Sequence, residues 1–239
     1  MRIVHLYPDL LGTYGDRGNV LCLAKRAEWR GIDVALDATE RGDPLPPDAD
    51  LIFIGGGQDR AQELIAPELF EMRPRIAQAA QNGTVVFAVC GGYQLLGTHY
   101  RTADGDVPGL GLLDLWTESG SERILGNASV ECAIGDAHGV LVGFENHAGR
   151  THLGPKAEPL GKVISGRGNN GADDGEGAVQ GNIIGTYLHG PVLPRNVWFA
   201  DALLRLALAG ADVDFPALDD ELEFAAHERG LELARRRRR

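Results

Sequence analysis

The chain has 239 residues, of which 44% are hydrophobic and 24% are charged. A chain of this length and composition can bury a full hydrophobic core, which excludes a disordered or fibrous protein. The formal net charge of −11 repels phosphate backbones, so we expect no nucleic acid as a partner.

The sequence also bears on the cellular compartment. The chain has three cysteines, which are too few for a disulfide framework and are typical of a protein kept in a reducing compartment. No apolar run reaches the roughly 18 residues that a membrane-spanning helix needs. The first residues read as a strand and lack the apolar stretch of a signal peptide. We therefore expect a cytoplasmic protein.

The first hundred residues show alternating strand and helix patterns. They predict strands at 1–6, 32–36, 50–54 and 84–89, and helices at 16–29, at 62–82 with interruptions at Pro67 and Pro74, and from Tyr93 onward. Short, continuous apolar runs such as 50–54 are typical of buried parallel strands. The order of the elements therefore predicts an α/β fold with a mostly parallel sheet.

The second half of the chain has weaker patterns. Residues 109–163 are dense in short strands and turns, which we expect to add strands to one edge of the sheet. A strand at 182–187, a helix at 194–209 and a terminal helix at 219–235 follow; the last has the acidic start and basic end that the helix dipole favours. We expect one domain over 1–210, followed by a C-terminal helix and arginine-rich tail at 211–239.

Cys90 is the strongest candidate for chemistry, because it follows an apolar run and precedes two glycines. Such a strand-to-helix turn exposes a nucleophile on a strained backbone for which small neighbours make room. The start of the following helix favours the thiolate, which is the reactive form. The alternative is an inert core thiol, as a free cysteine often is.

A second apolar strand ends in three glycines at 55–57. Backbone amides in such a loop can stabilise an oxyanion, which needs two donors near the nucleophile. The amides of Gly57 and Gly91 are the natural pair. The alternative is a tight turn that needs glycine for its backbone conformation.

A cysteine nucleophile also needs a base. His189 follows the predicted strand 182–187 and would lie on the same edge as Cys90 if both strands share the sheet. His147 is the rival candidate. The histidines in segment 144–152 lack the spacing of a helical zinc pair, so we predict no metal site.

These segments resemble the class I glutamine amidotransferases, in the branch shared with cobyric acid synthase. More narrowly, they resemble GatD, the glutaminase subunits of lipid II isoglutaminyl synthases. The residues that carry the resemblance lie at 10–19, 55–59, 90–94, 144–151, 168–171 and 185–191. The tail after Ala209 carries no matching motif. The resemblance implies a three-layer α/β glutaminase fold.

The resemblance also implies a division of roles. Cys90 would attack the side-chain carboxamide of L-glutamine, and His189 would relay protons. The amides of Gly57 and Gly91 would hold the oxyanion, and Arg123 would hold the glutamine substrate. A guanidinium suits a carboxylate because it can donate two parallel hydrogen bonds; the alternative for Arg123 is a surface charge.

Two residues depart from the family pattern. Ala88 stands two residues before the nucleophile, where many members have glycine. Pro191 stands two residues after the histidine, where many members have a glutamate that orients the imidazole. The resemblance implies that a partner subunit, a MurT-like ligase, supplies the third member of the triad.

The ligase would use ATP and the released ammonia to convert the D-glutamate of the lipid II stem peptide to D-isoglutamine. This chain lacks a Gly-x-x-x-x-Gly-Lys-Ser/Thr loop, so we expect no cofactor in it. The alternatives are another Cys–His hydrolase or amidotransferase subunit on this fold, such as a peptidase or a cobyric acid synthase-like subunit, and a non-catalytic module.

Five arginines occupy residues 235–239. Such a run is either a solvated end or a segment attracted to anionic lipid headgroups. The second alternative would place the protein near the inner face of the membrane, where lipid II resides.

Overall fold

The computed structural model describes residues 1–12, 15–102, 105–211 and 213–235. Its central sheet has six strands in the order β11-β12-β4-β3-β1-β2, all parallel except β11. The strands are β1 (Arg2–Leu6), β2 (Ala35–Thr39), β3 (Leu51–Ile54), β4 (Val85–Val89), β11 (Ala178–Gln180) and β12 (Ile183–Thr186). The predicted parallel sheet is therefore confirmed, because β1, β3 and β4 are buried runs without polar alternation.

The strand predicted at 32–36 is displaced in the structure. β2 begins only at Ala35, where its pairing with Arg2 of β1 starts. It is one of the two edge strands of the sheet and is largely exposed. Because Thr39 is the only buried residue of β2, no core-facing pattern marks the bounds of this strand in the sequence.

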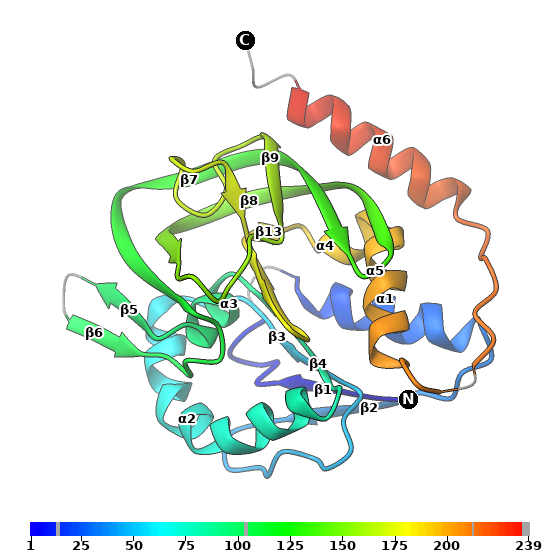
Figure 1. Ribbon diagram of the computed structural model, residues 1–239, viewed down its shortest axis with the longest axis horizontal. Helices are drawn as coiled ribbons and strands as arrows, with labels where there is room; N and C mark the ends of the chain where they lie inside the picture. The colour runs from blue at the N-terminus through cyan, green and yellow to red at the C-terminus, as the bar shows by residue number, and fades with distance from the viewer. Residues whose placement is uncertain (13–14, 103–104, 212, 236–239) are drawn as a thin grey trace.

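Helices cover both faces of the sheet, which completes the three layers. Figure 1 shows α2 and α3 on one side of β1–β4, and α1 and α5 on the other. The helices are α1 (Arg17–Glu28), α2 (Asp59–Gln81), α3 (Gly91–Leu96), α4 (Val192–Arg195), α5 (Val197–Ala207) and α6 (Glu221–Arg235).

Two helix predictions need correction. Pro67 and Pro74 do not interrupt α2, which runs through both. Its apolar face, including the fully buried Leu69 and Ile76, packs in the core and outweighs the hydrogen bonds that the prolines remove. The helix predicted at 194–209 is instead divided at Asn196, whose side-chain amide donates to the carbonyl oxygens of residues 142 and 192.

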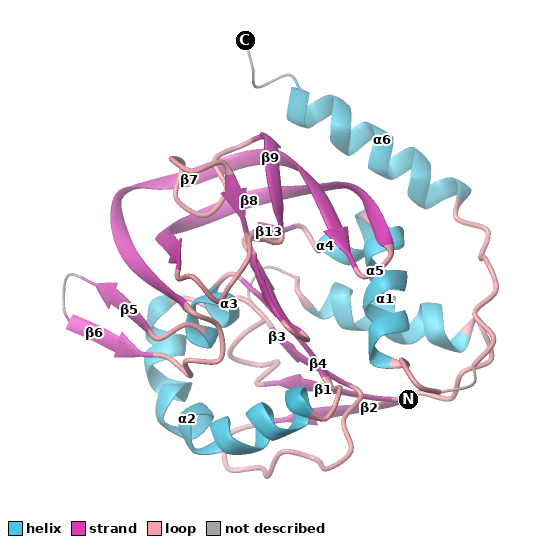
Figure 2. Cartoon of the chain, in the orientation of Figure 1, coloured by secondary structure: helices cyan, strands magenta, loops and turns pink. Residues whose placement is uncertain are grey.

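The expectation of short strands at one edge of the sheet is wrong for residues 109–163. They form most of a separate, seven-stranded sheet that Figure 2 shows arching over the parallel strands. Its strands are β5 (His99–Thr102), β6 (Gly105–Pro108), β7 (Leu115–Ile134), β8 (Ala137–Leu153), β9 (Gly161–Ser165), β10 (Gly175–Glu176) and β13 (Leu188–His189). The segment 118–123 carries no apolar side chain, yet it lies inside the 20-residue β7, where the register of β7 with β8 shifts.

The C-terminal helix α6 is confirmed and packs along β7, β8 and α4. The buried guanidinium of Arg26 joins the segment before it to the body of the protein. Its Nη1 donates to Asp220 at 2.5 Å, and its Nε donates to Asp201 at 2.7 Å. The division of the chain into 1–210 and 211–239 stays a prediction. Four of the five terminal arginines lie outside the described residues.

Candidate active site

Cys90 lies at the sharp turn between β4 and α3. Its backbone has φ 50° and ψ −106°, a strained region for a residue with a side chain. Gly92 makes this turn possible, because a Cβ there would stand 2.6 Å from the carbonyl oxygen of Ile54. The helix begins at Gly91, two residues earlier than the sequence predicted, so the Cys90 side chain stands at the N-terminus of α3.

The structure brings Cys90 and His189 together beside Gly56. A Cβ added to Gly56 would lie 3.2 Å from Cys90 Cβ and 3.2 Å from His189 Cε1. The two side chains are therefore neighbours at one end of the parallel sheet. β12 ends at Thr186 and pairs with β4, so the two strands share the sheet as the prediction required, while His189 itself lies in β13 and pairs with Phe144 of the second sheet.

Burial controls the charge of the His189 imidazole. The side chain is 3% exposed, and burial, followed by the positive charge of Arg123, lowers its pKa to about 4. The imidazole is therefore neutral near pH 7 and able to take up a proton. A proton acceptor beside a thiol is the arrangement that cysteine chemistry needs.

The two glycines predicted to stabilise an oxyanion also meet here. A Cβ added to Gly91 would lie 3.0 Å from the backbone nitrogen of Gly57. Within the described part of the chain, neither amide donates a hydrogen bond. Both are thus available to an oxygen bound next to the Cys90 sulfur.

A cavity of about 360 Å³ opens onto Cys90. Its lining is mainly polar and comes from five segments of the chain: Gly57, Gln58, Arg60, Gln62, Cys90, Gln94, Tyr100, Arg123, Asn146, His147, Ala148 and Gly149. Arg123 lies at its rim, where Nη1 donates to the side-chain oxygen of Asn146 at 2.9 Å. The structure thus places Arg123 and Cys90 in the same cavity, although 33 positions separate them in the sequence.

His147, the rival base, forms part of the cavity wall. Its ring stacks on Tyr187 with 3.7 Å between centroids, and its Nδ1 lies 2.9 Å from the carbonyl oxygen of Gly149. Burial lowers its pKa to about 3. The stacking and the Gly149 contact fix the ring in place, so His147 is less suited than His189 to gaining and losing protons.

A hydrogen-bonded wall continues from His147, and sequence reasoning did not find it. Gln94 donates to Tyr187 Oη at 3.1 Å and accepts from Gln62 at 3.1 Å. Tyr187 Oη in turn lies 2.6 Å from Thr151 Oγ1. Its members belong to segments that carried the family resemblance or to α2, but nothing in the sequence indicated that they contact one another. The wall therefore presents uncharged polar groups to the cavity.

Asp16 is a second residue that sequence reasoning left without a role. It belongs to segment 10–19, which carried part of the family resemblance, and its side chain is fully buried. Its Oδ2 accepts a hydrogen bond from the Gly56 amide at 2.6 Å. The sequence signal was an acidic residue at a helix start, which ordinarily indicates a helix cap.

Glu176 lies behind the Tyr187 side of the wall. Its Oε1 accepts from the Tyr187 amide at 2.7 Å and from Thr186 Oγ1 at 3.0 Å. Burial raises its pKa from 4.5 to about 8. The folded chain therefore keeps a proton on Glu176 that the unfolded chain releases above pH 4.5.

This difference predicts a pH-dependent cost to stability. Between pH 4.5 and about 8 the free energy of unfolding should fall as the pH rises, by about 1.4 kcal/mol per pH unit from this group alone. The substitution Glu176→Gln removes that slope. Urea unfolding of both proteins at pH 5 to 8 measures the effect: the free energy of unfolding of the variant, relative to that of the wild type, should increase as the pH rises. A difference that stays constant with pH would contradict the assignment.

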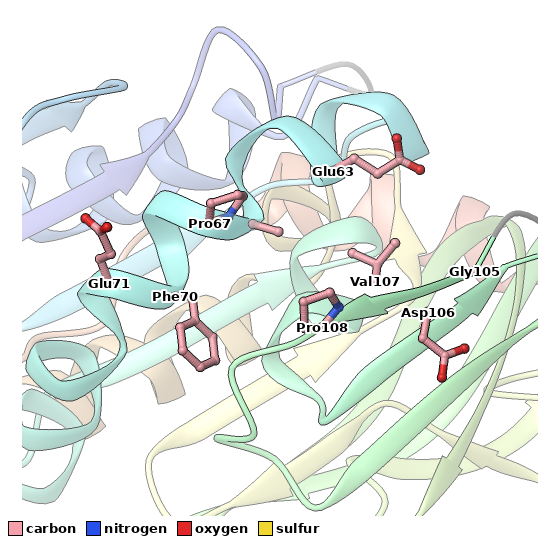
Figure 3. Close-up of a pocket in the computed structure, with 9 residues that line it drawn as sticks. Glu63, Pro67, Phe70, Glu71, Gly105, Asp106, Val107 and Pro108 are labelled. Carbon is pink, nitrogen blue, oxygen red and sulfur yellow. The ribbon is translucent and has the colours of Figure 1, made fainter.

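A larger cavity of about 620 Å³ lies elsewhere, between α2 and β6. Figure 3 shows Phe70, Pro67, Val107 and Pro108 lining it, with Glu63 and Glu71 at its margin. It shares no lining residue with the cavity at Cys90. Across the described residues, no three or more His, Cys, Asp or Glu side chains gather into a group that could hold a metal ion, and none of the helices has the length and hydropathy of a membrane span.

The arrangement of layers and strands matches solved structures of one class of protein. A glutamine amidotransferase from Thermotoga maritima superposes with a TM-score of 0.55 and 17% identity, covering 99% of this chain and 90% of that one. At such low identity the likeness concerns the fold. It is the fold of a glutamine amidotransferase, as the sequence predicted.

Sequence comparison shows to which family of glutamine amidotransferases the chain belongs. The family model of the CobB/CobQ-like glutamine amidotransferase domain matches residues 2–197, and the chain belongs to this family. It is 39% identical to the GatD subunit of lipid II isoglutaminyl synthase (glutamine-hydrolyzing) from Staphylococcus aureus strain N315, over 100% of this chain and 98% of that protein. A cobyric acid synthase from Pelotomaculum thermopropionicum is 35% identical, over 74% of this chain but 35% of that protein.

Proposed function

We propose that this chain is the glutaminase subunit of a lipid II isoglutaminyl synthase. The observation that carries the proposal is the match to a GatD subunit along nearly the entire length of both chains. The meeting of Cys90 and His189 beside Gly56 supports it, because it supplies a nucleophile and a base at one point.

The proposed reaction begins with proton transfer from the Cys90 thiol to His189. The sulfur attacks the side-chain carbonyl carbon of L-glutamine, and the amides of Gly57 and Gly91 hold the resulting oxyanion. His189 then gives its proton to the nitrogen as the C–N bond breaks, and ammonia leaves. Water, deprotonated by His189, attacks the thioester; the C–S bond breaks, glutamate forms and the thiol is restored.

Arg123 is proposed to bind the carboxylate of the glutamine backbone. Because this ionic hydrogen bond is made in the ground state and the transition state alike, Arg123→Ala should raise KM by about tenfold to a hundredfold with little change in kcat. Glutamate release at varied glutamine concentration measures both constants. Arg229→Ala, which removes an exposed arginine of α6, is the control and should change neither. An unchanged KM in the Arg123→Ala variant would contradict a role of Arg123 in binding glutamine.

The ligase partner, its ATP and its lipid II acceptor belong to the same proposal. Pro191 occupies the position where many class I members have their third catalytic residue, so a MurT-like ligase is proposed to complete the triad on docking. Glutamine hydrolysis by the chain alone should then be slower than hydrolysis by the complex. Equal turnover of the two would refute a partner-supplied residue. Location near the membrane, helped by the arginine tail, stays part of the proposal.

Co-purification with a candidate MurT-like ligase tests the function. The complex should amidate a D-glutamate-containing stem-peptide precursor with ATP and glutamine as the nitrogen source. The alternative, a cobyric acid synthase-like amidotransferase subunit, would release glutamate but leave this acceptor unchanged. A complex that uses free ammonium and ATP but not glutamine would contradict the glutaminase role.

A further inference from the structure

Asp16 is a buried carboxylate for which the proposed reaction has no use. It stands immediately before α1, at the position where aspartate usually caps the helix. Its side chain makes no capping hydrogen bond, and its own backbone is already helical, with φ −60° and ψ −19°. A fully buried carboxylate that does not cap its helix must be stabilised by other contacts.

The main contact is with the glycine loop. The Gly56 amide donates to Asp16 Oδ2 at 2.6 Å, whereas the Asn19 side chain makes a longer contact with Oδ1, at 3.5 Å. A short hydrogen bond to a charged acceptor is stronger than one to a neutral acceptor. It fixes the peptide that enters Gly56, one residue before the proposed oxyanion donor Gly57.

The same carboxylate lies beside the nucleophile and the base. Asp16 Oδ2 is 3.1 Å from the point where a Cβ of residue 56 would stand, and Cys90 Cβ and His189 Cε1 are each 3.2 Å from that point. The three side chains therefore surround one glycine. Gly56 cannot be larger without displacing them.

The first turn of α1 also contacts the loop that follows His189. A Cβ on Gly18 would stand 3.2 Å from Cβ of Pro191, which shows how closely the two backbones approach. The buried Asn19 accepts a hydrogen bond from the Leu193 amide at 2.9 Å. One helical turn thus holds both the glycine loop and the segment that carries His189.

We infer that Asp16 is a positioning residue for the glutaminase reaction. Its charged hydrogen bond fixes the loop of Gly57, and its negative charge stabilises the imidazolium that His189 becomes on taking the Cys90 proton. The inference rests on the proposed function. It places one carboxylate of the site within this chain, in addition to any group that a partner supplies.

The substitution Asp16→Asn separates charge from shape, because the amide oxygen can still accept from Gly56. We expect kcat of the ligase complex to fall about tenfold to a hundredfold, with KM for glutamine within twofold of wild type. Asp16→Ala, which also removes the hydrogen-bond acceptor for the Gly56 amide, should lower kcat further. A kcat within twofold of wild type in Asp16→Asn, or a loss confined to KM, would overturn the inference.

Asp50→Asn is the matched control. Asp50 also accepts from a backbone amide at 2.6 Å, that of Arg2, but it lies at the opposite end of β3 from the glycine loop. Its variant should retain wild-type kcat. An inactive wild-type complex would refute the proposed function, whereas an active wild type with an equally active Asp16→Asn variant would refute this inference alone.

An NMR titration of the wild-type chain tests the same inference even if the variants do not fold. Burial raises the pKa of Asp16 to about 6, so the Gly56 amide proton should shift upfield in NMR spectra as the pH falls from 8 to 5. Among the described residues, the ionisable groups beside Asp16 include Cys90, His189 and the adjacent Arg17, and the pKa of His189 lies below this window at about 4. An Asp16 carboxyl carbon whose NMR shift titrates with pH while the Gly56 amide shift stays constant would overturn the inference.

Discussion

Replacing Cys90 by alanine should lower the rate of glutamate release by at least about a thousandfold, because no thioester can form without the sulfur. The fold should survive, since alanine is smaller than cysteine and tolerates the same turn as well as cysteine does. The measurement is glutamate production from glutamine by the complex with its ligase. Ammonium-dependent amidation by the same complex should persist, because the ligase reaction needs ammonia and not this thiol.

The other cysteines provide the controls for this experiment. Burial raises the pKa of Cys22 and of Cys132 to about 12, so both are unreactive thiols. Cys22→Ala should retain glutamate release within twofold, and a glutamine-like electrophile should label Cys90 alone. Glutamate release above about a tenth of the wild-type rate in Cys90→Ala would show that another group is the nucleophile.

The sequence predicted the parallel sheet and the turn at Cys90 because both depend on local patterns. β3 and β4 are uninterrupted apolar runs that end in glycines, and such runs are recognisable without knowledge of their partners. The second sheet was missed for the opposite reason. β7 and β8 are long, half exposed and stabilised by pairing with each other, so residues 109–163 read as short strands and turns.

The candidate site was predictable only where a residue type and its local context indicate chemistry. Cys90 met that condition, whereas His189 and Arg123 needed the family resemblance as well. Asp16 and Gln94 were not assigned because their contacts join distant segments: Asp16 to Gly56, and Gln94 to Tyr187. Such contacts depend on how the layers pack, which single-sequence patterns do not encode.

The identity of the base is open to direct test, because His189 and His147 are both buried near Cys90. His189→Ala should reduce kcat by about a thousandfold, since neither the thiol nor the leaving nitrogen then has a proton partner. His147→Gln should reduce kcat less than tenfold, on the order expected when a wall residue is lost rather than a base. Initial rates of glutamate release at saturating glutamine measure both.

The two variants should differ because the rings of His189 and His147 have different contacts. His147 is stacked on Tyr187 and contacts the Gly149 carbonyl, so its loss should disturb the wall and the free energy of unfolding more than proton transfer. His189 lies with Cys90 at Gly56, so its loss should change proton transfer with little effect on KM. The exposed His138 of β8 is the control, and its alanine variant should be fully active. Equal losses in the His189 and His147 variants would mean that the imidazole beside Cys90 is not the sole base, and the reaction would need two histidines.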